Sequence, residues 1–426
     1  MATTVINERI LRKAIQKILS SRERSGYWVD SEEEDPQETM VYKGQEAFKL
    51  ILIVKKHFPQ LLGTFKFDDK FIIDEIKYLY DNYKEEGFFP SPYSFTRENY
   101  DIIDFASHCV CVVSEVLPLT RKDFFSKVKK TPKKEIQKSL LEILKDALRF
   151  IKDSSFSDKH GTCWEGIYGE KRKKPSFPNV YFTSHAIKAL SKAVNFEELH
   201  LTNEEKEGYI KLIKQGVHWI FQCEKDALIT ADIKKTRSEV NFGVYAFLGI
   251  FDVWKYLDAS QQEKATALFE NLLNYFKNNL DSLITQSSFQ VLLPEAKKPS
   301  YYEDRISKGH VLSVLCRGKD ILKDASFINE EYDNLVTNVL RIVLDEGNLN
   351  EGYWQKDNYY LHYTCDCIIG LLDYESYGTV VEYTFNETDI LQALNNTLKR
   401  AEIRNMFLSE LNKIQVKKQL KEFKGN

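Results

Sequence analysis

Residues 179–192 read NVYFTSHAIKALSK, and the chain repeats this pattern. A polar start leads into a helix whose small and apolar residues recur every three or four positions, which is typical of a buried helix. Residues 106–115, ASHCVCVVSE, align with it without a gap, and so do residues 364–371, TCDCIIGL. In this alignment His108 and His185 share one position with Asp366. The repetition indicates one structural unit that is copied along the chain.

Each of these helices follows an amphipathic partner, and the pair recurs at a spacing of roughly sixty residues. The predicted pairs are 7–20 with 44–57, 69–84 with 101–117, 134–153 with 179–192, 204–222 with 238–256, 261–279 with 307–322, and 329–344 with 364–374. Asn7 is the expected N-cap of the first helix. An open solenoid needs polar caps at both ends, but the first buried helix is as apolar as the middle ones. The sequence therefore predicts an all-α fold, an (α/α)6 toroid of six helical hairpins.

The two parts of the chain differ in character. We expect residues 1–380 to form the toroid and residues 381–426 to form a C-terminal helical extension. The extension is rich in lysine, so it packs on the outside of the ring or binds a protein partner.

Composition excludes several classes of protein. The 426 residues are 43% hydrophobic and 29% charged with a net charge of −3, which does not favour nucleic acid as a partner. The basic segments 127–134 and 171–174 lack a Gly-rich phosphate loop, so we interpret them as surface loops. The seven cysteines form no Cys-x-x-Cys pair, and we find no secretory signal and no apolar run that would span a membrane. These features predict a reduced, cytoplasmic protein.

The loop before the buried helix carries a second recurring pattern. Trp164-Glu165-Gly166 is followed by Pro175-Ser176 and then Thr183, and Gly352-Tyr353-Trp354 is followed by the segment HYTCDC at residues 362–367. This pattern resembles the repeat of the terpenoid cyclase and protein prenyltransferase superfamily, whose fold is an alpha-alpha toroid. The resemblance implies the same ring, and an isoprenoid-handling enzyme is one function that it implies.

The motifs that carry that superfamily's chemistry are missing. Class II terpene cyclases protonate their substrate from an Asp-x-Asp-Asp motif, which this sequence lacks. Protein prenyltransferases hold zinc partly through an Asp-x-Cys pair, which residues 305–316 do not contain. We therefore expect a divergent toroid without a metal and without a cofactor.

The starts of the buried helices converge on the interior of the predicted ring. The aligned copies place one layer of side chains there: Glu46, His108, His185, Phe242, Gly309 and Asp366. Helix N-termini carry unpaired N–H groups and partial positive charge, so they favour an anionic ligand, and Arg237, Arg305 and Lys308 would add to this. The residues that we expect to bind a ligand are Gln45, Glu46, Ser107, Ser184, Arg237, Asn241, Arg305, Lys308, His310 and His362.

Three interpretations of this layer remain open. The serines and histidines could cap the helix starts and satisfy buried backbone groups. They could instead bind a small molecule or peptide without reacting with it. In a catalytic interpretation His108 and His185 transfer protons near neutral pH, while Asp366 or Glu239 orients one of them. A metal site from the two histidines and Asp366 is chemically allowed, but its ligands come from separate repeats.

We favour a toroid that binds a ligand or protein segment in a polar, histidine-containing central cavity. The enzymatic alternative is a hydrolase or lyase that works by His and carboxylate acid–base chemistry, because six-hairpin toroids also resemble several glycosidase and polysaccharide lyase folds. The side chains that line the cavity discriminate between the possible substrates. Aromatic walls favour an isoprenoid, and carboxylates about 5 to 10 Å apart favour glycoside chemistry.

Overall fold

The structure is a computed structural model that describes most of the predicted ring. The described residues are 2–22, 28, 41–62, 71, 74–75, 101–118, 133–158, 161–164, 167–168, 180–222, 239–285, 290–291, 302–303, 308–348, 352–354 and 361–377. The predicted extension over residues 381–426 lies outside them.

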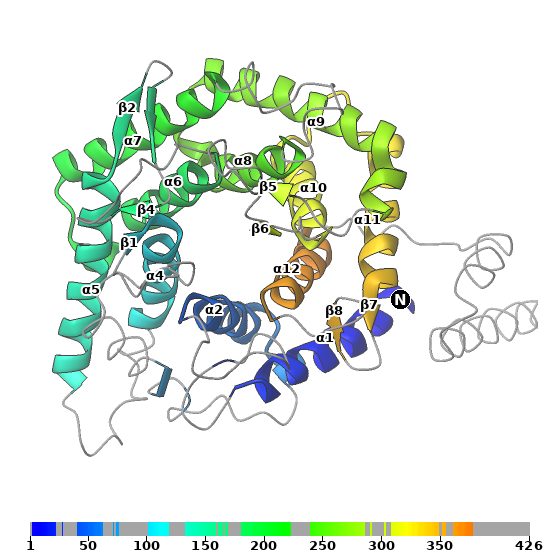
Figure 1. Cartoon of the computed structure of the whole chain (residues 1–426), viewed down its shortest axis with the longest axis horizontal. Helices are drawn as coiled ribbons and strands as arrows, with labels where there is room; N and C mark the ends of the chain where they lie inside the picture. The colour runs from blue at the N-terminus through cyan, green and yellow to red at the C-terminus, as the bar shows by residue number, and fades with distance from the viewer. Residues whose placement is uncertain are drawn as a thin grey trace, which may run out of the picture.

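The inner wall of the ring is built from the second helix of each hairpin (Figure 1). These helices are α2 (Val41–His57), α4 (Ile103–Val116), α6 (Val180–Val194), α8 (Glu239–Val253), α10 (Lys308–Ile321) and α12 (Leu361–Tyr377). Each of them contacts the next, and α12 contacts α2. The ring is therefore closed, and the predicted toroid is confirmed.

The outer wall is built from the first helix of each hairpin, and Figure 1 shows these helices surrounding the inner ring. They are α1 (Ala2–Ser20), α5 (Lys133–Asp153), α7 (Asn203–Gln222), α9 (Ala259–Thr285) and α11 (Glu330–Glu346). Of the helix predicted over residues 69–84, the structure describes Phe71, Asp74 and Glu75, all of them helical. Short 3-10 turns follow three inner helices: η2 (Pro59–Leu62), η5 (Glu197–Leu199) and η7 (Trp254–Tyr256).

Local sequence explains where the outer helices begin and which face they bury. The α5 helix buries Leu144, Ala147 and Ile151 at helical spacing, so one apolar stripe faces the ring. The α7 helix follows a capping box in which the Thr202 hydroxyl accepts from the Glu205 N–H at 3.2 Å and the Glu205 carboxylate accepts from the Thr202 N–H at 2.8 Å.

The helix limits differ from the predicted ones mainly at their ends. The first helix begins at Ala2, so Asn7 lies inside it and is not its N-cap. Within the described residues the loops also contain four two-stranded antiparallel ladders, which were not predicted. The paired strands are β1 (Asp101–Ile102) with β4 (Ile167–Tyr168), β2 (Phe156–Asp158) with β3 (Gly161–Cys163), β5 (Gln290–Val291) with β6 (Tyr302–Glu303), and β7 (Gly347–Asn348) with β8 (Tyr353–Trp354).

The recurring tryptophan and threonine have the same structural role in two hairpins. The Trp164 N–H donates to the Thr183 hydroxyl at 3.3 Å, and its indole N–H donates to the Ile151 carbonyl at 2.6 Å. Trp354 repeats both bonds, with Thr364 at 3.3 Å and the Val343 carbonyl at 2.6 Å. Each tryptophan thus ties its loop to both helices of its hairpin.

Candidate functional site

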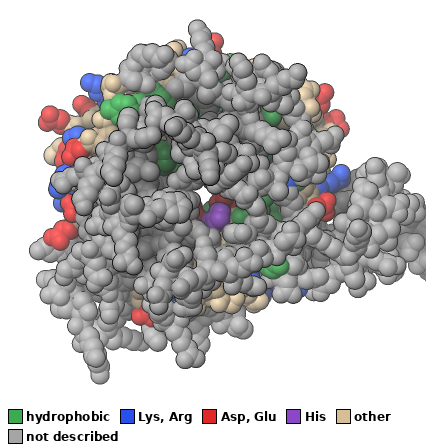
Figure 2. All heavy atoms as spheres, in the orientation of Figure 1, with side chains coloured by type: hydrophobic (Ala, Val, Ile, Leu, Met, Phe, Trp, Pro, Cys, Tyr) green, Lys and Arg blue, Asp and Glu red, His purple; other side chains and the backbone are tan. Residues whose placement is uncertain are grey.

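A cavity of about 100 Å³ lies inside the ring, and all six inner helices line it. This volume has room for several water molecules or one small polar molecule. In the space-filling view of Figure 2, histidine atoms are visible at the centre of the ring. The lining side chains are Glu46, Lys49, His108, Tyr181, Ser184, His185, Lys188, Tyr245, Leu248, Gly249, His310, His362, Cys365, Asp366 and Ile369.

Contacting rings form an arc around this cavity from α4 to α10. The centroids of His108 and His185 are 5.1 Å apart, and Tyr181 follows at 4.4 Å from His185. Tyr245 lies edge-on to Tyr181 at 4.7 Å and to His310 at 5.4 Å. The arc places three imidazoles and two phenol rings from four helices around one small space.

A carboxylate faces the imidazole at each end of the arc. The Nε2 atom of His108 lies 3.5 Å from a Glu46 oxygen, and the Nε2 atom of His310 lies 3.1 Å from an Asp366 oxygen. Glu46 comes from α2 and Asp366 from α12, and these two helices contact each other. The polar side chains therefore form a ring of their own inside the ring of helices.

The two central histidines are neutral near pH 7. Burial is the main reason, and the nearby His185 and Lys49 add to it, so the pKa of His108 lies well below its usual value. Burial and then Lys188 and Lys49 lower the pKa of His185 in the same way. Neutral imidazoles can accept a proton, which is what a general base requires.

A charged cluster lies one helical turn from the histidines. Lys188 contacts Asp252 at 2.9 Å, and Arg317 pairs with the other oxygen of the same carboxylate. Burial alone would raise the pKa of Asp252, but Arg317 and Lys188 outweigh it and hold this pKa far below its usual value. Asp252 therefore stays ionised between two cations.

Several of the predicted site residues line the cavity together. From the predicted catalytic set these are His108, His185 and Asp366. From the predicted ligand-binding set they are Glu46, Ser184, His310 and His362.

Other predicted residues lie elsewhere. Ser107 is buried and donates to the Ile103 carbonyl of its own helix at 2.7 Å, so it does not cap a helix start. Lys308 is buried but is not among the residues that line the cavity. Gly309 was predicted in the layer, but a Cβ atom there would meet the Asp366 carbonyl at 2.2 Å, so this glycine packs against α12 and His310 faces the cavity instead.

The capping interpretation is not supported by Ser184 either, because its buried hydroxyl has no hydrogen-bond partner within the described residues. Arg237 and Arg305 lie outside the described residues, as do the side chains of Gln45, Glu239, Asn241 and Phe242. Their predicted roles stay predictions.

The alignment overlooked two lysines and two tyrosines that line the cavity, namely Lys49, Lys188, Tyr181 and Tyr245. Lys49 and Lys188 stand three positions after Glu46 and His185, and Tyr181 stands four before His185. Residues at these spacings share one helix face. Extending the aligned layer by one turn in each direction would have found them.

The described residues contain no group of three or more His, Cys, Asp or Glu side chains that is placed to hold a metal ion. His108, His185 and Asp366 thus line the same cavity without forming the metal site that their side-chain chemistry allows. No helix in the described part of the chain is long and apolar enough to cross a membrane.

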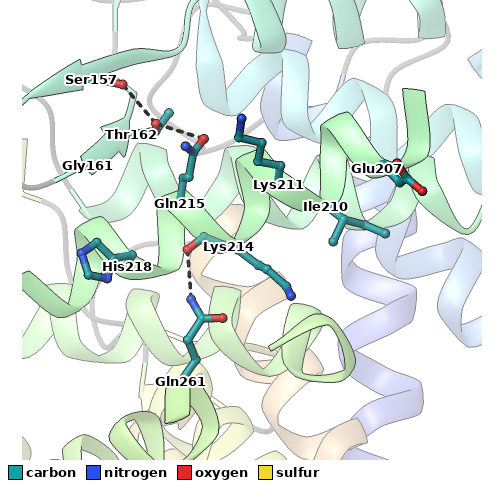
Figure 3. Close-up of a pocket in the computed structure, with 10 residues that line it drawn as sticks. All are labelled: Ser157, Gly161, Thr162, Glu207, Ile210, Lys211, Lys214, Gln215, His218 and Gln261. Carbon is teal, nitrogen blue, oxygen red and sulfur yellow. Dashed lines mark hydrogen bonds between the residues drawn. The ribbon is translucent and has the colours of Figure 1, made fainter. Parts of the chain in front are cut away.

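A larger hollow of about 610 Å³ lies outside the inner ring, between the β2–β3 hairpin, α7 and the start of α9 (Figure 3). Several of its polar groups bond to one another. The Ser157 and Thr162 hydroxyls are 3.2 Å apart, Thr162 donates to Gln215 at 3.4 Å, and Gln261 donates to the Lys214 carbonyl at 3.1 Å. The central cavity, in contrast, is lined by the contacting imidazoles, by two carboxylates that each face an imidazole and by the unbonded Ser184 hydroxyl, and it is therefore the candidate site.

Comparison with known proteins identifies the class of fold. No family model and no curated protein sequence matches the chain. Solved structures of (α/α)6 toroids do match. A D-mannose isomerase has 10% identity and a TM-score of 0.54 over 87% of this chain and 98% of its own. The cellobiose 2-epimerase of Bacillus thermoamylovorans B4167 has 10% identity and a TM-score of 0.52 over 87% of this chain and all of its own.

A third similar structure is an inactive variant of the alpha-1,6-mannanase of Salegentibacter sp. HEL1_6 in complex with alpha-1,6-mannotetrose. It has 10% identity and a TM-score of 0.52 over 86% of this chain and 98% of its own. The chain is thus a six-hairpin toroid whose fold is shared with carbohydrate-active proteins. The resemblance to the terpenoid cyclase superfamily holds for the toroid, and none of these three structures is a terpene cyclase.

Proposed function

We propose that this protein binds a carbohydrate in its central cavity and moves a proton on it, as a sugar isomerase or epimerase does. The contact between the neutral imidazoles of His108 and His185, in a cavity lined by every inner helix, carries the proposal. The fold shared with carbohydrate-active toroids supports a sugar rather than another polar ligand.

The proposed chemistry is proton transfer at the carbon next to a sugar carbonyl. One neutral imidazole accepts the proton from this carbon and becomes an imidazolium. The electron pair of the C–H bond moves to the carbonyl oxygen and gives an enediolate. Epimerisation is completed when the proton passes to the other imidazole and is returned to the opposite face of the same carbon. Isomerisation is completed when the proton is returned to the neighbouring carbon and the hydroxyl proton moves from one oxygen of the enediolate to the other. Because two charged imidazoles with centroids 5.1 Å apart repel each other, the pair holds one proton at a time.

Hydrolysis by two carboxylates is a weaker fit to this cavity. That mechanism needs two acidic groups on either side of the scissile bond. Here Glu46 faces His108 and Asp366 faces His310, so each acid is engaged by an imidazole. The charged and polar side chains that line the cavity are a poor match for an apolar isoprenoid substrate. The similarity in fold to carbohydrate-active toroids favours an enzyme over a protein that binds its ligand without reacting with it.

The test is solvent proton exchange. The full chain is incubated with D-mannose, D-glucose or cellobiose in D₂O, and NMR follows deuterium at C2 and any new sugar. We expect exchange with at least one of these sugars, and His185→Asn should slow it by about 10² to 10⁴-fold because the proton acceptor is lost. His57→Asn, at the exposed end of α2, is the matched control and should keep the wild-type rate.

Release of reducing ends from a manno-oligosaccharide without exchange at C2 would overturn the proposal in favour of hydrolysis. Equal exchange rates in the wild type and in His185→Asn would overturn the assignment of the imidazole pair.

A further inference from the structure

Two lysines stand in the cavity wall one helical turn from the imidazoles. Lys49 on α2 follows Glu46 by three residues, and Lys188 on α6 follows His185 by three. One turn of helix is about 5.4 Å, so a single sugar ring can span both levels. Proton transfer between imidazoles does not require these ammonium groups.

Of the two lysines, only Lys188 forms an ion pair within the described residues. Lys188 and Arg317 both form ion pairs with Asp252, so one carboxylate is paired with two cations. Glu46 faces His108, and Asp366 faces His310.

Asp373, near the same cluster, accepts a hydrogen bond from Ser313. Within the described residues no ion pair or hydrogen bond engages the Lys49 ammonium group. Burial and then the charge of Lys188 lower the pKa of Lys49, while Glu46 and Asp252 oppose this with smaller effects. The ammonium group of Lys49 thus lies in the cavity wall without an ion-pair partner among the described residues, and the second cation, Lys188, disfavours its charged form.

An unpartnered donor lines the same cavity. Ser184 lines the cavity and is 3% exposed, and its hydroxyl has no hydrogen-bond partner within the described residues. Buried polar groups are nearly always bonded, so an unbonded one in a cavity wall points to a ligand atom.

We propose that the ligand of this cavity is an anionic sugar whose carboxylate or phosphate group binds Lys49 and Lys188 and accepts a hydrogen bond from Ser184. This inference rests on the proposed function and names its substrate class. Hydrogen bonds between ammonium groups and an anion are about twice as strong as neutral ones, and they also offset the mutual repulsion of the two lysines.

Calorimetric titration of the full chain tests this class. The probes are D-mannose and D-glucose as neutral sugars, mannose 6-phosphate and glucuronate as their anionic counterparts, and inorganic phosphate. We expect at least one anionic sugar to bind 10-fold or more tightly than its neutral parent. Lys49→Met should remove this preference, and Lys49→Arg should restore part of it.

Lys56→Met is the matched control, because Lys56 lies on the same helix with a side chain that is 62% exposed. It should bind all five probes as the wild type does. The thermal midpoint of each variant shows whether it is folded.

The outcomes separate the two proposals. Equal binding of neutral and anionic sugars, or an unchanged preference in folded Lys49→Met, overturns the anion site even if proton exchange at C2 is observed. Binding of inorganic phosphate that Lys49→Met abolishes supports the anion site even if no sugar is turned over. Preference for glucuronate over mannose 6-phosphate identifies a carboxylate, and the reverse preference identifies a phosphate ester.

Discussion

At the scale of single residues, the two central histidines of the cavity are neutral in the folded protein. His108 is 5% exposed, and burial is the largest cause of its lowered pKa, as it is for His185. In the unfolded chain both histidines regain a pKa of about 6.5. The unfolded state therefore binds more protons than the folded state as the pH falls through that value toward the lowered pKa of the folded state.

This difference makes stability depend on pH. Because the unfolded state takes up the extra protons, the free energy of unfolding should fall between pH 7 and pH 5 by up to about 1.4 kcal/mol per pH unit for each histidine. His185→Asn should flatten this dependence, whereas His57→Asn should not. Urea unfolding at pH 7, 6 and 5 measures it. A wild-type stability that rises as the pH falls to 5 would contradict the neutral assignment.

Sequence alignment found part of the site and missed part for identifiable reasons. His108, His185 and Asp366 were placed in one layer because their repeats align without a gap. The aligned layer put Gly309 where His310 faces the cavity, although His310 was itself among the expected ligand-binding residues. The helix contact that occupies Gly309 cannot be inferred from the pattern of a single helix.

At the scale of helices, the closest approach in the inner ring is between α10 and α12. A Cβ atom on Gly370 would lie 2.3 Å from the Gly309 carbonyl oxygen, and a Cβ atom on Gly309 would lie 2.2 Å from the Asp366 carbonyl oxygen. Two glycines thus let two helix backbones touch, and this contact holds His310 of α10 next to Asp366 of α12.

Substitution of either glycine should force these helices apart. Gly370→Ala should lower the free energy of unfolding by about 3 kcal/mol, because backbone atoms cannot yield as a flexible side chain can. Gly208→Ala on α7 is the matched control, because nothing lies within 4 Å of its Cβ position. Gly208→Ala should raise stability by about 0.5 to 1 kcal/mol through helix propensity. Denaturant unfolding compares the two, and equal effects would contradict the close contact.

Helices were predictable where their pattern is long, and short elements were not. The predicted range 204–222 differs from α7 by one residue, because a capping box marks its start and an apolar stripe runs along it. Strands of two residues, such as those that pair Gly347 with Trp354, are too short to show alternation. Strand β8 is held in place by the contacts of Trp354 with Thr364 and Val343.

At the scale of the whole molecule, closure distinguishes this ring from a solenoid. The apolar character of the first inner helix predicted a closed ring. In the structure α12 contacts both α1 and α2, so the last hairpin packs against the first. In a solenoid each repeat contacts only its neighbours, so the terminal repeats are the weakest. In a closed ring every hairpin has two neighbours, and no repeat is terminal.

Closure predicts that all hairpins unfold together. The five tryptophans can be labelled with 5-fluorotryptophan, which gives one ¹⁹F resonance for each without substitution. Trp28, Trp164 and Trp354 are fully buried and report on the first, third and sixth hairpins. We expect one urea midpoint for all the resonances. Earlier loss of the Trp28 and Trp354 signals would indicate ends that fray and would contradict a closed ring.

A substitution at the contact between the last hairpin and the first provides a second test of cooperative unfolding. Gly352 has φ +79°, a conformation that favours glycine, and a Cβ atom there would lie 2.7 Å from the Lys13 carbonyl oxygen of α1. Gly352→Ala therefore strains the contact between the last hairpin and the first. In a closed, cooperative ring it should lower the midpoint of every resonance equally, including that of Trp164 on the opposite side. A shift confined to Trp28 and Trp354 would show that the hairpins unfold independently.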